Sequence, residues 1–298
     1  MTDLRHCDDT RPGFGQPQGA DVVEIRRPSD QTVPVVFASP HSGRDYPQAF
    51  VAASRLELPG LRRSEDSFVD ELFAAAPAHG APLLLARFPR AYCDPNREAW
   101  ELDPAMFAGP LPDWVNTTSA RVGAGLGTIA RIVASGEAIY RGKLDFAEAQ
   151  ARVAQCWQPF HAELRTLITA TQARFGQCLL IDCHSMPGLS QVRGERVDIV
   201  LGDAHGTACA PRVIRRIEEC LLDLGFRVRR NDPYAGGYIT RHYGRPREGC
   251  HAVQVEICRS LYMDEARIAP LPQFAAIAAR WSDLISRVAA EDGFLSLA

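Results

Sequence analysis

Short apolar runs alternate along the chain with longer segments in which apolar residues recur at helical spacing. The short runs predict strands at residues 33–38, 82–88, 91–93, 178–183, 197–201, 226–229 and 252–258. The longer segments predict helices at residues 64–76, 146–175 with a break near Pro159, 210–224, and most of 263–290. Strands that alternate with helices are typical of a layered α/β/α fold.

The other segments are polar or rich in turn-forming residues. Residues 1–20 are predicted to be a flexible tail. Residues 95–118 carry four prolines and are predicted to form a long loop, which is ordered by its aromatic residues. Loops of this length are commonly functional. Because the chain shows no internal repeat or linker, we predict one catalytic domain over residues 21–298.

Composition narrows the range of partners. The 298 residues are 46% hydrophobic and 23% charged, with a net charge of −3. Neither a nucleic acid nor a membrane is therefore an expected partner. The nine cysteines are scattered without a Cys-x-x-Cys pair, as is typical of a reducing compartment. We expect a cytoplasmic protein without a signal peptide. The sequence leaves the oligomeric state open, and a monomer is one candidate.

Polar residues follow several predicted strands at the point where each strand ends. His41 and His184 follow two of them, and Asp203 with His205 follows a third. Ligands bind beyond the carboxyl ends of strands in open α/β sheets, so His41 and His184 are well placed to share a metal. Catalytic zinc takes three ligands from histidines and carboxylates and keeps one position for water. The alternative is that each histidine is structural and held by hydrogen bonds.

Acidic residues supply candidates for a third ligand and for a catalytic base. Glu65 and Asp66 begin the predicted helix after the His41 loop and can offer the metal a carboxylate. Glu256 lies in an apolar strand, where an ionised carboxylate is costly unless it is paired or functional. It is therefore a candidate general base toward water. The structural alternative is an ion pair between Glu256 and Arg259.

Three further features are less specific. Asn96 and Arg97 follow a strand, and a guanidinium can bind a carboxylate through two hydrogen bonds, although a solvated turn has the same sequence. The paired glycines in residues 233–240 allow either close approach to a ligand or a tight turn. Cys183 is a poor candidate nucleophile because burial in an apolar strand raises the pKa of a thiol.

Eight segments together resemble the N-formylglutamate amidohydrolase family, and they occur in family order. They are SPHSGRDYP (39–47), EDSFVDELF (65–73), YCDPNRE (92–98), GLGTIAR (125–131), IDCHSMP (181–187), DIVLGDAHG (198–206), PYAGGYIT (233–240) and VQVEICRSLYMDE (253–265). The family is similar in fold to zinc carboxypeptidases and related deacylases. The resemblance thus implies a three-layer α/β/α fold with a mixed, mostly parallel sheet.

The resemblance implies one zinc ion, or another divalent metal, held by His41, Asp66 and His184. Zinc carboxypeptidases carry a short His-x-x-Glu ligand pair, but Arg44 stands in the place of that glutamate. The middle ligand is therefore the least defined position of the site. Its two rival candidates are Glu65 and Asp45.

The resemblance also implies roles around the substrate. Glu256 matches the catalytic carboxylate of those enzymes, and Asn96 with Arg97 matches their pair that grips a substrate carboxylate. Arg259 would assist in this binding or orient Glu256. Members dedicated to histidine degradation tend to carry tryptophan after the aspartate ligand, where this chain has Ser67, and the loop after Arg97 also differs from theirs.

The function implied is that of a zinc-dependent amidohydrolase, which cleaves N-formyl-L-glutamate or a similar N-acyl amino acid to formate and glutamate. Its partner is then a small-molecule carboxylate, and the loop at 95–118 is expected to set the width of the acyl pocket. Two alternatives stay open. One is a deacylase of a different N-acyl amino acid or small peptide, and the other is a non-catalytic protein that binds small carboxylates on the same fold.

Overall fold

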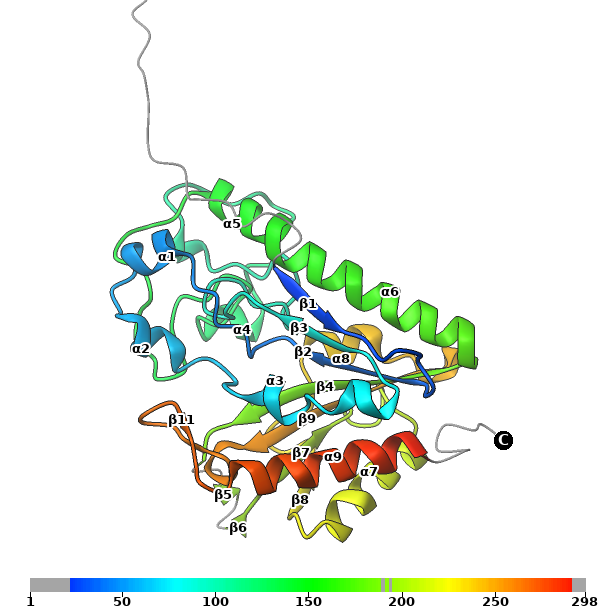
Figure 1. Ribbon diagram of the computed structural model, residues 1–298. Helices are drawn as coiled ribbons and strands as arrows, with labels where there is room; N and C mark the ends of the chain where they lie inside the picture. The colour runs from blue at the N-terminus through cyan, green and yellow to red at the C-terminus, as the bar shows by residue number, and fades with distance from the viewer. Residues whose placement is uncertain (1–21, 189–190, 193–194, 291–298) are drawn as a thin grey trace, which may run out of the picture.

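A seven-stranded sheet forms the centre of the computed structural model, which describes residues 22–188, 191–192 and 195–290 (Figure 1). Its strand order is β1-β3-β2-β4-β9-β7-β8. The strands are β1 Val23–Arg26, β2 Val35–Ser39, β3 Leu83–Ala86, β4 Cys178–Met186, β7 Ile199–Gly202, β8 Val228–Arg230 and β9 Cys250–Cys258. β1 is antiparallel to β3 and β7 to β9, whereas the other neighbours are parallel. The predicted mixed, mostly parallel sheet is confirmed.

Helices cover both faces of this sheet, which confirms the three layers (Figure 1). One face carries α6 Gln158–Phe175 and α8 Tyr238–Tyr243. The other carries α3 Val69–Leu72, α7 Pro211–Asp223 and α9 Phe274–Ala290. The shorter elements are α1 Gln48–Ala53, α2 Leu58–Arg62, α4 Ala120–Gly123, α5 Phe146–Arg152, the 3-10 turns Ala76–His79, Pro104–Met106, Pro246–Glu248 and Arg259–Leu261, and the paired strands β5 Gln191–Val192, β6 Glu195–Arg196, β10 Met263–Asp264 and β11 Ala269–Pro270.

Two apolar cores lie on the two faces because successive residues of a strand point to opposite sides. In β3, Leu83 and Leu85 pack in the core with α7 and α9, whereas Leu84 and Ala86 pack in the core with α6. All four side chains are buried. Strands that are covered on both faces are apolar throughout, which is why short apolar runs located most of them.

Three of the predicted elements were wrong in part. Residues 91–93 form a turn, and residues 263–270 form the β10–β11 hairpin before α9 begins. The helix predicted at 64–76 shrinks to α3 and a 3-10 turn. The reason is local: Phe68 has a left-handed backbone with φ 67°, and the amide of Asp66 donates to the carbonyl of His41. A helix therefore cannot begin before Val69.

Other boundaries agree with the pattern more closely. The break near Pro159 is a π-helical turn, Val153–Trp157, which joins α5 to α6 ahead of a residue that has no backbone N–H. Gly225 follows α7 with φ 78°, the left-handed conformation that favours glycine at a helix end. The predicted tail at residues 1–20 lies outside the described residues. In the part of the chain that is described, no helix is both long and apolar enough to cross a membrane.

Candidate active site

The site begins where polar residues replace apolar ones on the α6 face of β4 and β9. The register places Leu180 beside Ala252 in the core, and further along it places His184 beside Glu256. Asp182 and Gln254 form the pair between them. All four polar side chains are buried. Two adjacent parallel strands thus present a polar group at one edge of an otherwise apolar face.

Asp203 and His205 do not join this group. They follow β7, which runs antiparallel to β9, so the end of β7 points away from the ends of β4 and β9. The Asp203 carboxylate instead accepts hydrogen bonds from the side chain of Asn231 and the amide of Gly206. The prediction of one shared edge therefore held for the parallel strands and not for β7.

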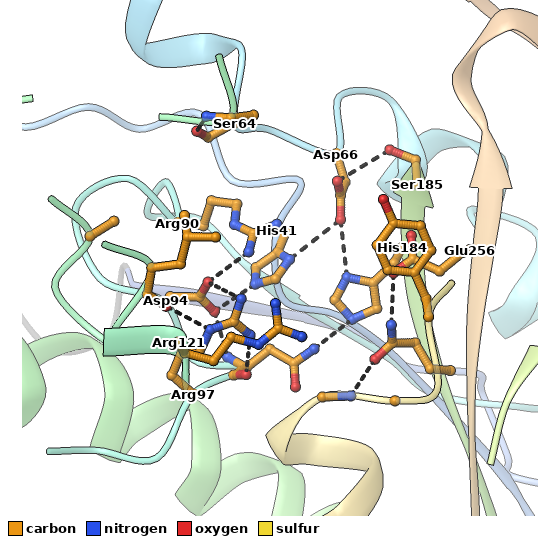
Figure 2. A pocket seen from close by; sticks show the side chains of 18 of the residues that line it. His41, Ser64, Asp66, Arg90, Asp94, Arg97, Arg121, His184, Ser185 and Glu256 are labelled. Carbon is orange, nitrogen blue, oxygen red and sulfur yellow. Dashed lines mark hydrogen bonds and ion pairs between the residues drawn. The ribbon is translucent and has the colours of Figure 1, made fainter. Parts of the chain in front are cut away.

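Asp66 lies between His41 and His184 (Figure 2). Its Oδ2 atom is 3.4 Å from Nδ1 of His41 and 3.0 Å from Nδ1 of His184. One ligand atom from each of the three side chains falls within 4.8 Å of the others, and all three are buried. His41 Nδ1 has no hydrogen-bond partner despite its burial. An unpaired imidazole nitrogen beside a second imidazole and a carboxylate is a donor set that fits a metal ion.

The opposite nitrogen of each histidine is held by a carboxylate. His41 Nε2 is 2.7 Å from Asp94, and His184 Nε2 is 2.8 Å from Asp182. Carboxylates in these positions fix the tautomer that leaves Nδ1 free to coordinate a metal. Burial by itself would raise the pKa of Asp94, but its contact with His41 and the charges of Arg90 and Arg97 hold that pKa well below its usual value. Asp94 is therefore ionised, as this role requires.

The two rival carboxylates lie elsewhere. Glu65 is buried and bonded to Arg62, Tyr46 and Ser67. Asp45 pairs with an arginine at the surface, and its side chain is 55% exposed. Of the three acidic candidates for a middle ligand, Asp66 is the one that faces both histidines.

Arg259 binds Asp66 and not Glu256. Its guanidinium donates to Asp66 Oδ1 at 2.9 Å, to the carbonyl of Glu65 at 2.7 Å and to the hydroxyl of Ser185 at 3.0 Å. These bonds turn the other oxygen of Asp66 toward the histidines. The ion pair considered for Glu256 and Arg259 is therefore wrong, and so is the expectation that Arg259 orients Glu256.

Glu256 faces the same cavity as the two histidines and Asp66. Its Oε1 atom accepts a hydrogen bond of 2.7 Å from Gln254, whose own carbonyl oxygen accepts one from the amide of Gly237. Burial raises the pKa of Glu256 to about 7. A carboxylate with this pKa can gain or lose a proton near neutral pH.

Asn96 and Arg97 reach the site from the turn after β3, but they differ in what they offer. The Asn96 side-chain amide group contacts His184 Nε2 at 3.1 Å, and its oxygen accepts a hydrogen bond from the amide of Ile239. Arg97 donates through Nε to the carbonyl of Leu126 and through Nη1 to the carbonyl of Asn96. These bonds fix the guanidinium and leave further N–H groups on Nη1 and Nη2.

The cavity around these groups measures about 390 Å³. Five residues between 121 and 134 form one wall: Arg121, Leu126, Ala130, Ile132 and Ala134. The loop at 95–118 contributes only Asn96 and Arg97 to the lining, so the expectation that this loop sets the pocket width was wrong. Its aromatic residues pack outward against α5, with Trp100 and Trp114 both close to Phe146.

Several polar residues of the site were missed in the sequence, among them Arg90, Asp94, Arg121, Asp182 and Gln254. Asp182 had a detectable pattern, because it is a charged residue in an apolar strand two positions before His184, as Glu256 is in its own strand. Asp94 precedes a proline and an asparagine, a sequence that is equally typical of a solvated turn. Arg90 lies in a turn and Arg121 in the four-residue helix α4, and no local pattern separates either of them from surface arginines.

The fold and the site define an α/β enzyme with a candidate metal-binding triad beside a buried carboxylate, an arrangement suited to hydrolysis. The model of the N-formylglutamate amidohydrolase family matches residues 33–263. N-formylglutamate deformylases from Pseudomonas aeruginosa and Pseudomonas putida are 32% and 30% identical to the chain over 240 residues, which are 78% of this chain and 83% of each relative. A crystal structure of N-formylglutamate amidohydrolase from Ralstonia eutropha JMP134 is 36% identical, superposes with a TM-score of 0.85, and is matched over 90% of this chain and 97% of that one. The chain belongs to the N-formylglutamate amidohydrolase family, whose members hydrolyse a linear amide.

Proposed function

We propose that this chain is a zinc-dependent deformylase that hydrolyses N-formyl-L-glutamate to formate and L-glutamate. The observation that carries the proposal is the convergence of His41, Asp66, His184 and Glu256, from four separate segments, on one cavity lined with arginines. The deformylases named above, at 30–32% identity, support the choice of substrate.

His41 and His184 would hold the metal through their Nδ1 atoms, and Asp66 would hold it through Oδ2. Bound there, zinc would polarise the amide carbonyl and lower the pKa of water toward 7. Asp94, Asp182 and Arg259 keep the three ligands in place through the bonds described above. Their rigidity matters because a ligand set that is held by its neighbours binds a metal more tightly.

Glu256 would serve as the general base. It takes a proton from the attacking water and then delivers it to the nitrogen of the departing glutamate. Both transfers need a carboxylate with a pKa near the working pH, and burial supplies it here. Gln254 fixes one oxygen of Glu256, which leaves the other to face the substrate.

Two arginines would act directly on the substrate. Arg90 donates to Asp94 at 2.8 Å, and its charge acts on both Asp66 and Glu256, so it lies where negative charge on the carbonyl oxygen would be stabilised. Arg97 would bind the α-carboxylate with its remaining N–H groups. Asn96 would position α8, because its side-chain oxygen accepts a hydrogen bond from the amide of Ile239, and its amide group contacts the ring of His184.

An assay of L-glutamate release, with formate measured beside it for the formyl compound, tests the function. The purified chain, stripped of metal and reloaded with zinc, is given N-formyl-L-glutamate and N-acetyl-L-glutamate. We expect zinc-dependent formate release from the first and little turnover of the second. If the zinc-loaded enzyme turned over only the acetyl compound, the deacylase alternative would replace this proposal, and no turnover of either would favour the carboxylate-binding alternative.

The cysteines bear on where the reaction takes place. The eight cysteines in the described part of the chain are free and buried. Buried thiols without disulfides suit a reducing compartment, so we propose a cytoplasmic enzyme.

A further inference from the structure

The cavity holds more positive charge than the reaction uses. Among the described residues, its lining contains five arginines and three carboxylates: Arg90, Arg97, Arg121, Arg241, Arg259, Asp66, Asp94 and Glu256. Asp66 is paired with Arg259 at 2.9 Å, and Asp94 is paired with Arg90 at 2.8 Å and more distantly with Arg97 at 3.8 Å. Neither Arg121 nor Arg241 has an ion-pair partner within the described chain. The cavity can therefore bind a second anionic group in addition to the carboxylate proposed at Arg97.

Arg121 lies beside Arg97. Figure 2 shows their guanidinium groups together, on the side of the cavity opposite Glu256. Burial and the nearby charges of Arg90 and Arg121 lower the pKa of Arg97, although Asp94 opposes them. Cations placed this closely repel one another unless an anion lies between or against them. Arg121 thus carries a charge that the protein itself leaves uncompensated at this wall.

Arg97 and Arg121 lie at different depths in the cavity, and this difference indicates which carboxylate of the substrate each of them binds. Arg97 is 7% exposed and is fixed by two backbone carbonyls, whereas Arg121 is an exposed residue of α4. The α-carboxylate of an N-formyl amino acid lies two bonds from the reacting nitrogen, and a side-chain carboxylate lies farther out. The deeper guanidinium, that of Arg97, therefore suits the α-carboxylate. The outer guanidinium, that of Arg121, suits the side-chain carboxylate.

We propose that Arg121 binds the side-chain carboxylate of the substrate and so makes the enzyme selective for N-formyl amino acids with an acidic side chain. This inference rests on the proposed function and names the residue that sets its substrate class. Arg241 lies on α8, which is a different wall of the cavity, and it serves here as a comparison.

The test compares kcat/KM for N-formyl-L-glutamate and N-formyl-L-glutamine, which differ only in the charge of the side chain. Arg121→Gln should lower the value for the glutamate compound by about 10- to 100-fold, the usual effect of removing one hydrogen bond to a charged group. The value for the glutamine compound should change by less than about threefold, because that substrate has no charge to lose. The Ki of the product L-glutamate should rise together with the first effect, and Arg121→Lys should recover part of the loss.

Arg247→Gln is the matched control, since Arg247 lies in the turn before the opposite end of β9 and should leave both substrates unaffected. An unchanged ratio between the two substrates in Arg121→Gln overturns the inference. The same holds if Arg241→Gln, and not Arg121→Gln, abolishes the discrimination. In both cases the wild-type enzyme still releases formate, which separates this failure from a failure of the proposed function.

Discussion

Glu256 is the residue on which the proposed chemistry depends most directly. Replacing it with glutamine keeps its shape and the hydrogen bond to Gln254 but removes the base. We expect Glu256→Gln to lower kcat by about 10²- to 10⁴-fold, the usual contribution of a positioned base. Metal content, measured by elemental analysis, should stay at the wild-type level because Glu256 is not a ligand. Glu248→Gln, at the far end of β9, is the control, and equal loss in both variants would contradict the role.

The pKa of Glu256 also predicts the pH dependence of the reaction. A general base works only when it is ionised, so kcat/KM should fall about tenfold per pH unit below its pKa. Burial raises that pKa to about 7, and a bound cation favours the ionised form. The acidic limb of the profile should therefore have its midpoint at or below pH 7. The residual activity of Glu256→Gln should lack this limb, and a limb that persists there would assign it to another group.

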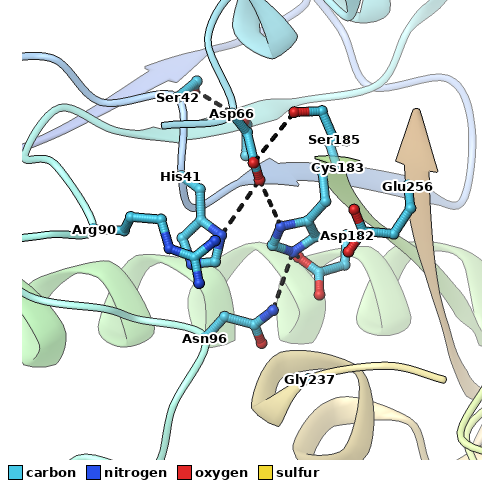
Figure 3. Close-up of polar contacts among 12 residues, drawn as sticks. His41, Ser42, Asp66, Arg90, Asn96, Asp182, Cys183, Ser185, Gly237 and Glu256 are labelled. Carbon is cyan, nitrogen blue, oxygen red and sulfur yellow. Dashed lines mark hydrogen bonds and ion pairs between the residues drawn. The ribbon is translucent and has the colours of Figure 1, made fainter. Parts of the chain in front are cut away.

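At the scale of elements, the segment before α8 supports the histidine site, because Gly237 packs against the Asn96 side chain that contacts His184. A β-carbon added at Gly237 would lie 2.4 Å from both terminal atoms of the Asn96 side chain, which contacts His184 (Figure 3). Gly237→Ala should therefore displace Asn96 and weaken zinc binding by roughly 10- to 100-fold, as measured by competition with a chromogenic chelator. Gly142→Ala is the control, because no atom lies within 4 Å of the added carbon. Equal zinc affinity in the two variants would contradict this supporting role.

The elements also show what could be predicted from the sequence and what could not. β2, β4 and β9 are apolar runs that end in polar residues, so the pattern located both the strands and His41, His184 and Glu256. The start of α3 was placed wrongly, because a left-handed backbone at Phe68 is imposed by the packing of that loop and leaves no mark on the apolar spacing. β1 was missed because it is a four-residue edge strand with partly exposed side chains.

The partners of the site residues escaped prediction for a different reason. The pairing of Asp94 with His41 and of Arg259 with Asp66 joins segments 53 and 193 residues apart. Nothing in a local pattern decides which of several acids and arginines will meet across such distances. The sheet order and register decide it, and these become visible only in the folded chain.

For the whole molecule, the site joins three segments that are distant in the sequence, because His41 comes from the turn after β2, Asp66 from the loop before α3, and His184 from β4. A metal that binds only the folded chain stabilises it by about 2.7 kcal/mol at 100 times its Kd. For a chain of this size, that amounts to a rise in Tm of roughly 5 °C. Calorimetry of the chelator-treated protein, with and without added zinc, should show this rise. Glu256→Gln should keep this rise in Tm, and Asp66→Asn should lose most of it. If zinc did not change the Tm of the wild-type protein, these three side chains would not form a metal site.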